Sequence, residues 1–296
     1  MNHEIERRAN ISYQDFVKEY ESSNKPVIIT DALRRWKAVG KWTPEFFKRE
    51  FGNRNLAIDK VAWGKYKGDS GREVTMESFV DRVLESTEEK PAPYLRNQNL
   101  LDLFPSLMQD IEPMSEYCFP NWLPEPYLAK NLQRAFREHS EVQFYFGGKG
   151  GSFPYLHFDV LATHAFLMEI YGRKKFIIFS PDQEKYLYRN LKNYSHVENV
   201  ENPDLQKFPL FAKAEPTIFV LEPGELLFVP SGWWHTTKML TACISVSLNV
   251  VNSSNWGALT EWVASGRKPA LRFPSRVYLN IAGLLRARRD QKVNLV

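Results

Sequence analysis

The strongest constraint on the fold is a series of short β-rich segments in the second half of the chain. Between Val142 and Val251 these segments are rich in β-branched and aromatic residues, and Gly, Pro, Asn or Asp separates each from the next. They read VQFYFGG, YLHFDV, HAFLMEIYG, KKFIIFSP, TIFVLEPG, ELLFVPSG and CISVSLNVV. Regular short strands broken by turns are typical of a closed or two-sheet antiparallel barrel of the jelly-roll class. We therefore expect a mainly β fold with helical additions.

The first part of the chain mixes helices and strands without repeats. Capping residues and β-branched runs predict N-terminal α/β elements beside the barrel. The expected elements are helices at 12–22, 43–52 and 75–84, strands at 27–30 and 56–61, and a Gly-rich turn at 64–71.

Helical periodicity returns after Trp256, in ALTEWVAS and again in RVYLNIAGLLRARR. We expect residues 1–252 to form one unit and residues 253–296 to form a C-terminal helical extension. The apolar stripes of these helices leave two alternatives open, which are a homodimer contact and packing back onto the barrel. The turn-rich stretch 104–127 also has two interpretations, a cleft wall with Tyr117, Phe119 and Trp122 or a packed connector.

Composition places the chain among globular proteins. Hydrophobic residues make up 43% of the 296 positions and aromatic residues 14%, which is enough for one large core. The start of the chain is charged and amphipathic, and no run of about 18 apolar residues occurs, so we expect neither a signal peptide nor a membrane span, and a cytoplasmic location. Cys118 and Cys243 lack CxxC spacing, which excludes a zinc finger and predicts two small buried hydrophobes.

The charge of the chain is mild, with a formal net charge of +4. One dense basic run lies near the C-terminus and consists of Arg286, Arg288, Arg289 and Lys292. We expect a solvated helix face there and keep nucleic-acid binding as a minor hypothesis.

The chemistry of the chain centres on His157 and Asp159, in YLHFDV. The period of two in a strand places the imidazole and the carboxylate on one face, while Phe158 points to the other. His235 supplies a third ligand, because a strand and a tight turn deliver it at the start of another strand. Two histidines and one carboxylate on neighbouring strands make a facial triad, the geometry that non-heme iron(II) oxygenases favour. Zinc sites more often show three histidines or added cysteines, and a manganese cupin stays an alternative.

The remaining histidines have structural interpretations. His3, His139 and His196 lie in polar, exposed stretches. His164 follows the His-x-Asp strand, and we expect a hydrogen-bonded structural histidine in preference to a pocket residue.

Several blocks in this order resemble the JmjC family, and specifically its small hydroxylase branch, which includes the asparaginyl hydroxylase of hypoxia-inducible factor and bacterial cupin-like relatives. The matching blocks are PVIITDALRRW, WTPEFFKREFGNR, PYLRNQ, HFDVLATHAFLMEIYGRKKFIIFSPDQEKYLY, EPGELLFVPSGWWH and SVSLNVV. The resemblance spans most of residues 10–252. It implies a double-stranded β-helix, the jelly-roll or cupin core, as a catalytic domain over residues 1–252.

The resemblance also implies a co-substrate site. The family binds 2-oxoglutarate to iron and anchors its far carboxylate with a lysine, which is Lys174 here; a charged turn is the alternative interpretation of this residue. Tyr94 matches a tyrosine that reaches the same carboxylate, and Asn249 matches an asparagine that lines the pocket. A dianion in a barrel of low dielectric constant needs a fixed cation and hydroxyl donors.

The sequence departs from the family pattern in the pocket. Pro154 stands where relatives often carry Ser or Thr, and Ala165 or Leu167 replaces a pocket asparagine. Ser152 or Thr163 is a candidate to compensate, and Thr163 is included among the predicted co-substrate residues.

The function that the resemblance implies is hydroxylation of a protein, peptide or small molecule, with Fe(II), 2-oxoglutarate and O2. Two alternatives are an Nε-methyl-lysine demethylase of the same family and a non-catalytic cupin-like binding module. Aromatic residues near the triad are candidate pocket walls, although core packing is the commoner role of barrel aromatics; they are Tyr145, Phe158, Phe166, Trp233 and Trp234.

Overall fold

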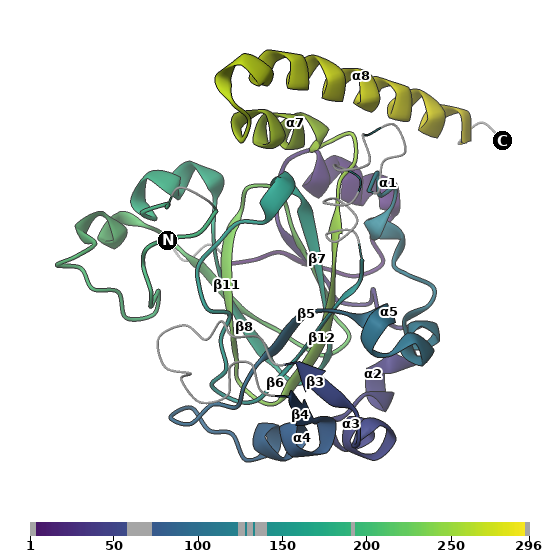
Figure 1. Ribbon diagram of the computed structural model, residues 1–296, viewed down its shortest axis with the longest axis vertical. Coiled ribbons are helices and arrows are strands. Elements are labelled where there is room, and N and C mark those ends of the chain that lie inside the picture. Colours follow the sequence, from purple (N-terminus) through teal and green to yellow (C-terminus); the bar gives the residue numbers. More distant parts are fainter. Residues whose placement is uncertain are drawn as a thin grey trace.

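The computed structural model describes residues 4–57, 73–123, 128, 133, 141–190 and 193–293. Figure 1 shows β-strands at the centre, α3 and α4 at one end of the molecule, and α7 and α8 stacked at the other. The predicted mainly β fold with helical additions is confirmed. The predicted Gly-rich turn at 64–71 and the second half of the predicted strand 56–61 lie outside the described residues.

Two antiparallel sheets form the barrel. The large sheet has the order β1-β2-β10-β7-β12-β6-β5, in which only the short β1–β2 pair is parallel, and the small sheet has the order β11-β8-β9. The large sheet consists of β1 (Arg7–Arg8), β2 (Val27–Ile29), β10 (Leu226–Val229), β7 (His164–Tyr171), β12 (Cys243–Val250), β6 (Gln143–Gly147) and β5 (Leu95–Asn99). The small sheet consists of β11 (Trp234–Met239), β8 (Lys174–Phe179) and β9 (Thr217–Leu221).

Alternation along β7 decides which side chains enter the barrel. Phe166 and Met168 are fully buried in the cluster outside the large sheet, which also contains Phe16 and Phe47. Ala165, by contrast, packs with residues of the small sheet inside the barrel. Because the period of a strand is two, the inward face of β7 continues from Ala165 through Leu167 to Glu169.

The N-terminal helices cover the outer face of the large sheet. The side-chain oxygens of Ser12, Thr43 and Thr75 each accept a backbone N–H three residues ahead, which starts the predicted helices as expected. Each fully buried Phe of these helices stabilises the fold by roughly 1.5–3 kcal/mol. The elements are α1 (Tyr13–Phe16, continued by a π-helical turn Val17–Glu21), α2 (Ala38–Lys41), α3 (Pro44–Phe51), β3 (Asn55–Ala57), β4 (Glu73–Thr75), α4 (Met76–Leu84) and α5 (Leu100–Leu103).

Short 3₁₀ segments join several of these elements. They are Pro105–Ile111, Glu116–Cys118, Val160–Ala162, Pro181–Tyr186 and Pro209–Lys213. In the stretch 104–123, Tyr117 and Trp122 are buried, and Tyr117 donates its hydroxyl to the Ile11 carbonyl at 2.7 Å. The interpretation as a packed connector is therefore correct for these two residues, whereas Phe119 is exposed.

The segment YLHFDV differs from the expected regular strand. His157 makes isolated bridges to His235 on one side and to Tyr194 on the other, and no ladder extends from them. Pro154 just before this segment has no N–H to donate to a ladder. The segment therefore keeps an extended course without becoming a full strand.

The C-terminal helices are α7 (Trp256–Ser265) and α8 (Pro269–Val293). Trp256 and Leu259 pack with Trp122, Val251 and Leu279 in one buried cluster, so α7 lies between the barrel and α8 (Figure 1). The helices thus pack back onto the barrel by one face. None of the helices in the described ranges is both long enough and apolar enough to cross a membrane. Cys118 and Cys243 are buried free thiols, as expected.

Candidate metal centre

His157 and His235 face each other across a backbone bridge. The N–H of His157 donates to the carbonyl of His235 at 3.0 Å, and the N–H of His235 donates back at 2.6 Å. This pairing brings the centroids of the two imidazoles to 4.3 Å. Trp234, next to His235, is fully buried in a cluster outside the small sheet, so the alternation of β11 turns His235 into the barrel.

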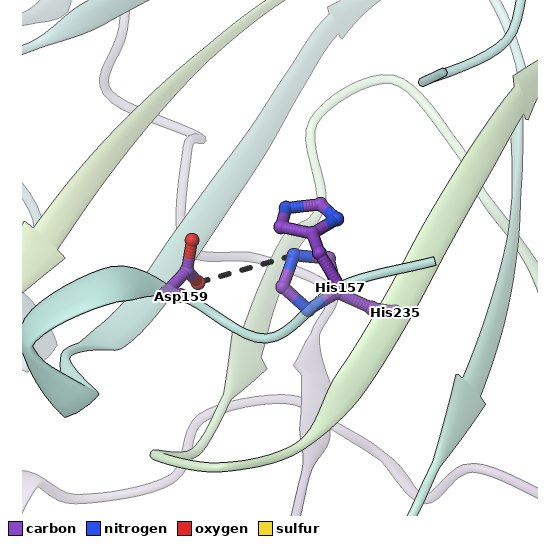
Figure 2. Close-up of side chains that lie close together, drawn as sticks. All are labelled: His157, Asp159 and His235. Atoms are coloured by element: carbon purple, nitrogen blue, oxygen red, sulfur yellow. Dashed lines mark ion pairs between the residues drawn. The ribbon is translucent and has the colours of Figure 1, made fainter. Parts of the chain in front are cut away.

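Asp159 completes a cluster of three possible ligands. Its Oδ2 lies 3.9 Å from Nε2 of His235, and Figure 2 shows the carboxylate directed toward the two imidazoles. One ligand atom from each of His157, Asp159 and His235 lies within 4.8 Å of the other two. In the described part of the chain this is the one group of three such residues close enough to share a metal ion.

The backbone after Asp159 forms a turn with a conformation that most residues avoid. Leu161 and Ala162 have φ values of 58° and 51°, a left-handed conformation that costs roughly 1–2 kcal/mol per residue. The Nδ2 group of Asn255 donates to the Ala162 carbonyl at 3.1 Å and holds this turn from the start of α7. The hydroxyl of Thr163 closes the turn by donating to the Val160 carbonyl at 3.3 Å.

Backbone carbonyls fix the tautomer of both imidazoles. Nδ1 of His157 lies 3.2 Å from the carbonyl oxygen of Tyr155, and Nδ1 of His235 lies 3.2 Å from that of Trp233. A carbonyl only accepts, so each Nδ1 carries the hydrogen and each Nε2 keeps its lone pair. Burial, together with the neighbouring His235, holds the pKa of His157 well below its usual range. Two imidazole lone pairs and one carboxylate fit a divalent metal of the facial-triad type.

Lys174 lies inside the barrel. Its side chain is only 5% exposed, its Nζ lies 3.0 Å from Oε2 of Glu169, and it also donates to Oγ of Ser245. Lys174 pairs with Met239 in the same sheet in which His235 pairs with Ile178, so both point to the inward face. The alternative of a charged surface turn is wrong for Lys174, whereas Arg173 beside it is exposed and pairs with Glu222.

The other predicted co-substrate residues surround this lysine to different degrees. Asn249 pairs with Ala165, which places it on the inward face of β12 with Ser245, and its side chain is half-buried. Burial, aided by the charge of Glu169, raises the pKa of Tyr94, so its hydroxyl is protonated at neutral pH. The hydroxyl of Thr163 is engaged with its own turn and not with the residues near Lys174.

Sequence reasoning missed the polar inner surface of the barrel. Ser245 and Ser247 lie beside Glu169 and Leu167 on the inward face, and Oγ of Ser247 donates to the hydroxyl of Tyr145 at 3.3 Å. The signal was present in CISVSLNVV, where Ser, Ser and Asn alternate with Ile, Val and Leu. Glu169 gave a weaker signal, a single carboxylate within the apolar segment HAFLMEIY.

The predicted aromatic walls divide into core and pocket residues. Phe158, Phe166 and Trp234 are buried in clusters outside the barrel, so for them the core interpretation is correct. Tyr145 lies on the inward face, where its hydroxyl donates to Oδ1 of Asn97 at 2.7 Å. The ring that stacks on His157 is Phe153, at a centroid distance of 4.4 Å and an interplanar angle of 17°.

His164 is a structural histidine, as expected. The N–H of Ser231 donates to its Nδ1 at 3.0 Å, and its Nε2 lies 2.8 Å from Oγ of Ser254. Both ring nitrogens are therefore occupied, and neither is available to a ligand.

The residues that depart from the family pattern in the pocket also have defined positions. Ala165 and Leu167 face inward and pack in an apolar cluster with Phe176 and Ile178 of the small sheet. An asparagine amide is therefore replaced by apolar packing at this level of the barrel. Ser152 is exposed and bridges to Lys238 at the edge of the sheet.

Comparison with known proteins shows which proteins this chain resembles. The family profile of the cupin-like domain matches residues 13–255. The chain is 32% identical over 244 residues to lysine-specific demethylase 8 of Danio rerio, covering 80% of this chain and 55% of that protein. It is 26% identical over 268 residues to 2-oxoglutarate and iron-dependent oxygenase JMJD4 of Gallus gallus, covering 85% and 60%.

A third relative is arginine-specific demethylase JMJ20 of Arabidopsis thaliana, 27% identical over 263 residues, covering 83% of this chain and 56% of that protein. The chain thus spans about half the length of the curated relatives it matches. The resemblance to JmjC proteins inferred from the sequence is confirmed. On the match over residues 13–255, this chain belongs to the cupin-like domain family.

Proposed function

We propose that this chain is an Fe(II)- and 2-oxoglutarate-dependent dioxygenase that hydroxylates a protein, a peptide or a small molecule. The observation that carries the proposal is the convergence of His157, Asp159 and His235 within 4.8 Å inside a barrel. The buried ammonium of Lys174 on the same inward face supports it. Independent support comes from the relative JMJD4, which is named as a 2-oxoglutarate and iron-dependent oxygenase.

In this proposal His157, Asp159 and His235 hold the iron, and Lys174 binds the far carboxylate of 2-oxoglutarate. Tyr94 and Asn249 are the proposed further contacts of the co-substrate, whereas the hydroxyl of Thr163, predicted as a third contact, donates to the Val160 carbonyl. When bound, iron with 2-oxoglutarate and O2 supplies the oxidising power to convert a C–H group into C–OH. The carbonyls of Tyr155 and Trp233 keep the two imidazoles in orientation, and the stacked ring of Phe153 keeps water from one face of His157.

The second candidate is demethylation of a methylated side chain. Two relatives favour it, because one is named as a lysine-specific and the other as an arginine-specific demethylase. The two reactions share the site and differ in product, because hydroxylation of an N-methyl group releases formaldehyde. The third candidate is a non-catalytic binding module. The complete set of three metal-ligand residues argues against it.

The first test is thermal stability. Iron under anaerobic conditions, added with 2-oxoglutarate at about 100 times its Kd, should stabilise the fold by about 3 kcal/mol, which raises Tm by about 5–10 °C. The variant His157→Ala should lose this gain. His196→Ala is the matched control, because His196 is exposed and outside the triad. A wild-type protein that shows no shift with either ligand would support the binding-module interpretation.

The second test is product analysis. Turnover of 2-oxoglutarate to succinate should be measured against a panel of peptides and metabolites, with a parallel assay for formaldehyde. Succinate with a product heavier by one oxygen atom is the expected result. Formaldehyde released from a methylated peptide would overturn the hydroxylase in favour of the demethylase.

We further propose a homodimer formed through α8. Its outer face carries exposed large apolar side chains, namely Leu271, Phe273, Val277, Tyr278, Ile281, Leu284 and Leu285. On a helix these residues lie on one broad side, and Leu279, which packs with residues of α7, lies on the opposite side. The division into a catalytic domain at 1–252 and an extension at 253–296, and the cytoplasmic location, stay predictions.

A further inference from the structure

Glu169 is a fully buried carboxyl group inside the barrel. It lies on the inward face of β7, opposite Ser245 of β12. Its Oε2 is 3.0 Å from Nζ of Lys174, so the carboxyl group and the ammonium form a buried ion pair. Removing both charges from water is costly, and one ion pair offsets that cost only where its geometry is good. This carboxyl group therefore needs an explanation beyond packing.

An ionised Glu169 balances the charge of Lys174 before any ligand enters. One ammonium faces one carboxyl group, and the other groups nearby are Tyr94, Tyr145 and Cys243. Burial raises the pKa of each of these three, so they stay neutral at physiological pH. A second cation, Arg96, stands with its Cζ 5.2 Å from the centroid of Phe153 and acts on Tyr94 and His157.

We propose that Glu169 is a proton-accepting residue of the 2-oxoglutarate pocket, which takes up one proton when the far carboxylate of the co-substrate binds Lys174. The inference rests on the proposed function. An ionised Glu169 and a ligand carboxylate would otherwise share a single ammonium in a medium of low dielectric constant. Like charges this close do not both stay ionised, and the group that can protonate does so.

The proton balance of this step is simple. The Glu169 carboxylate gains one H⁺ from solvent, no covalent bond to carbon changes, and Lys174 keeps its charge for the ligand. The protonated Glu169 then has an O–H to donate, so it changes from a competitor for Lys174 into a hydrogen-bond donor for the diacid.

The direction of the pH dependence follows from the free pocket. Burial raises the pKa of Glu169 to about 7, although Lys174 pulls it down. Below this pH Glu169 is already protonated, and binding takes up no proton. Above it, one proton must be added, so affinity for 2-oxoglutarate should fall by about tenfold for each further pH unit.

The experiment is calorimetric titration of the protein saturated with Mn(II), which substitutes for iron without turnover, with 2-oxoglutarate. Titrations in buffers of different ionisation enthalpy give the number of protons taken up. We expect about one proton at pH 8.5 and almost none near pH 6. The variant Glu169→Gln should take up none and should bind more tightly than wild type at pH 8.5, by about 30-fold.

Glu21→Gln is the matched control. Glu21 is also a buried carboxyl group whose pKa burial raises, but it accepts a hydrogen bond from Asn252 outside the barrel. This variant should keep the proton uptake of the wild type. If Glu169→Gln does not fold, infrared spectroscopy of the wild type alone still tests the proposal. Infrared difference spectra with ¹³C-labelled 2-oxoglutarate should show a protein carboxylate band replaced by a protonated carboxyl band at pH 8.5.

The outcomes separate this inference from the proposed function. Tight binding without proton uptake, or the same uptake in Glu169→Gln as in wild type, would refute the role of Glu169 and leave the dioxygenase proposal intact. Failure of the Mn(II)-saturated wild type to bind 2-oxoglutarate at any pH would refute both.

Discussion

At the scale of single residues, His164 shows how burial ties a side chain to one protonation state. Its Nδ1 accepts the N–H of Ser231, and its Nε2 meets the hydroxyl of Ser254. Burial lowers the pKa of His164 to about 3. The folded protein therefore requires the neutral imidazole, whereas the unfolded chain protonates near pH 6.5.

Acid should destabilise the fold through this histidine. Between pH 6.5 and 3 the unfolded state binds the extra proton, so the free energy of unfolding falls as pH falls. From pH 7 to 4.5 we expect a loss of about 2–3 kcal/mol from His164, measured by urea denaturation. His164→Asn should lose less over this range, while the exposed control His196→Asn should behave as wild type. Equal acid sensitivity in His164→Asn and wild type would contradict the assignment.

At the scale of elements, the turn between β7 and β8 sets the position of Lys174. Gly172 has a φ of 82°, and a Cβ atom there would lie 1.8 Å from the Ala242 carbonyl oxygen. Only glycine combines this conformation with so close a backbone approach. The turn at Gly172 thereby joins the two sheets two residues before Lys174, whose ammonium group lies inside the barrel.

Gly172→Ala should lower the free energy of unfolding by about 3 kcal/mol or more, since the clash is with backbone that cannot move alone. Gly224→Ala provides the comparison. Gly224 also has a left-handed φ, of 91°, but no atom within 4 Å of an added Cβ, so its cost should be about 1–2 kcal/mol. Denaturant titration of both variants checks the difference, and equal losses would show that the clash with Ala242 is not decisive.

At the scale of the whole molecule, the proposed dimer puts the exposed face of α8 against a second copy. The wild type should show twice its chain mass of 34.5 kDa by light scattering. Ile281→Glu combined with Leu284→Glu should give the mass of one chain, because two carboxylates would be buried without partners. The control is Leu205→Glu, an exposed leucine outside α8. A monomeric wild type at micromolar concentration would refute the dimer.

The sequence by itself determined the elements and the three candidate ligands. The barrel segments are readable because a period of two and turn residues are local properties, and the caps at Ser12, Thr43 and Thr75 act within one helical turn. The spacing of His157 and Asp159 is equally local. His235 was reached because a tight turn precedes it, and Lys174 only through resemblance to a known family.

Only the tertiary structure decided what these residues meet. The partner of Lys174 is Glu169, five residues earlier in the chain, and it became a partner because Gly172 folds β8 back across the barrel from β7. The strand expected at YLHFDV reduces to single bridges, from His157 to His235 on one side and to Tyr194 on the other. Side chains from two sheets meet inside a barrel according to register and closure, and neither is encoded within any one stretch of sequence.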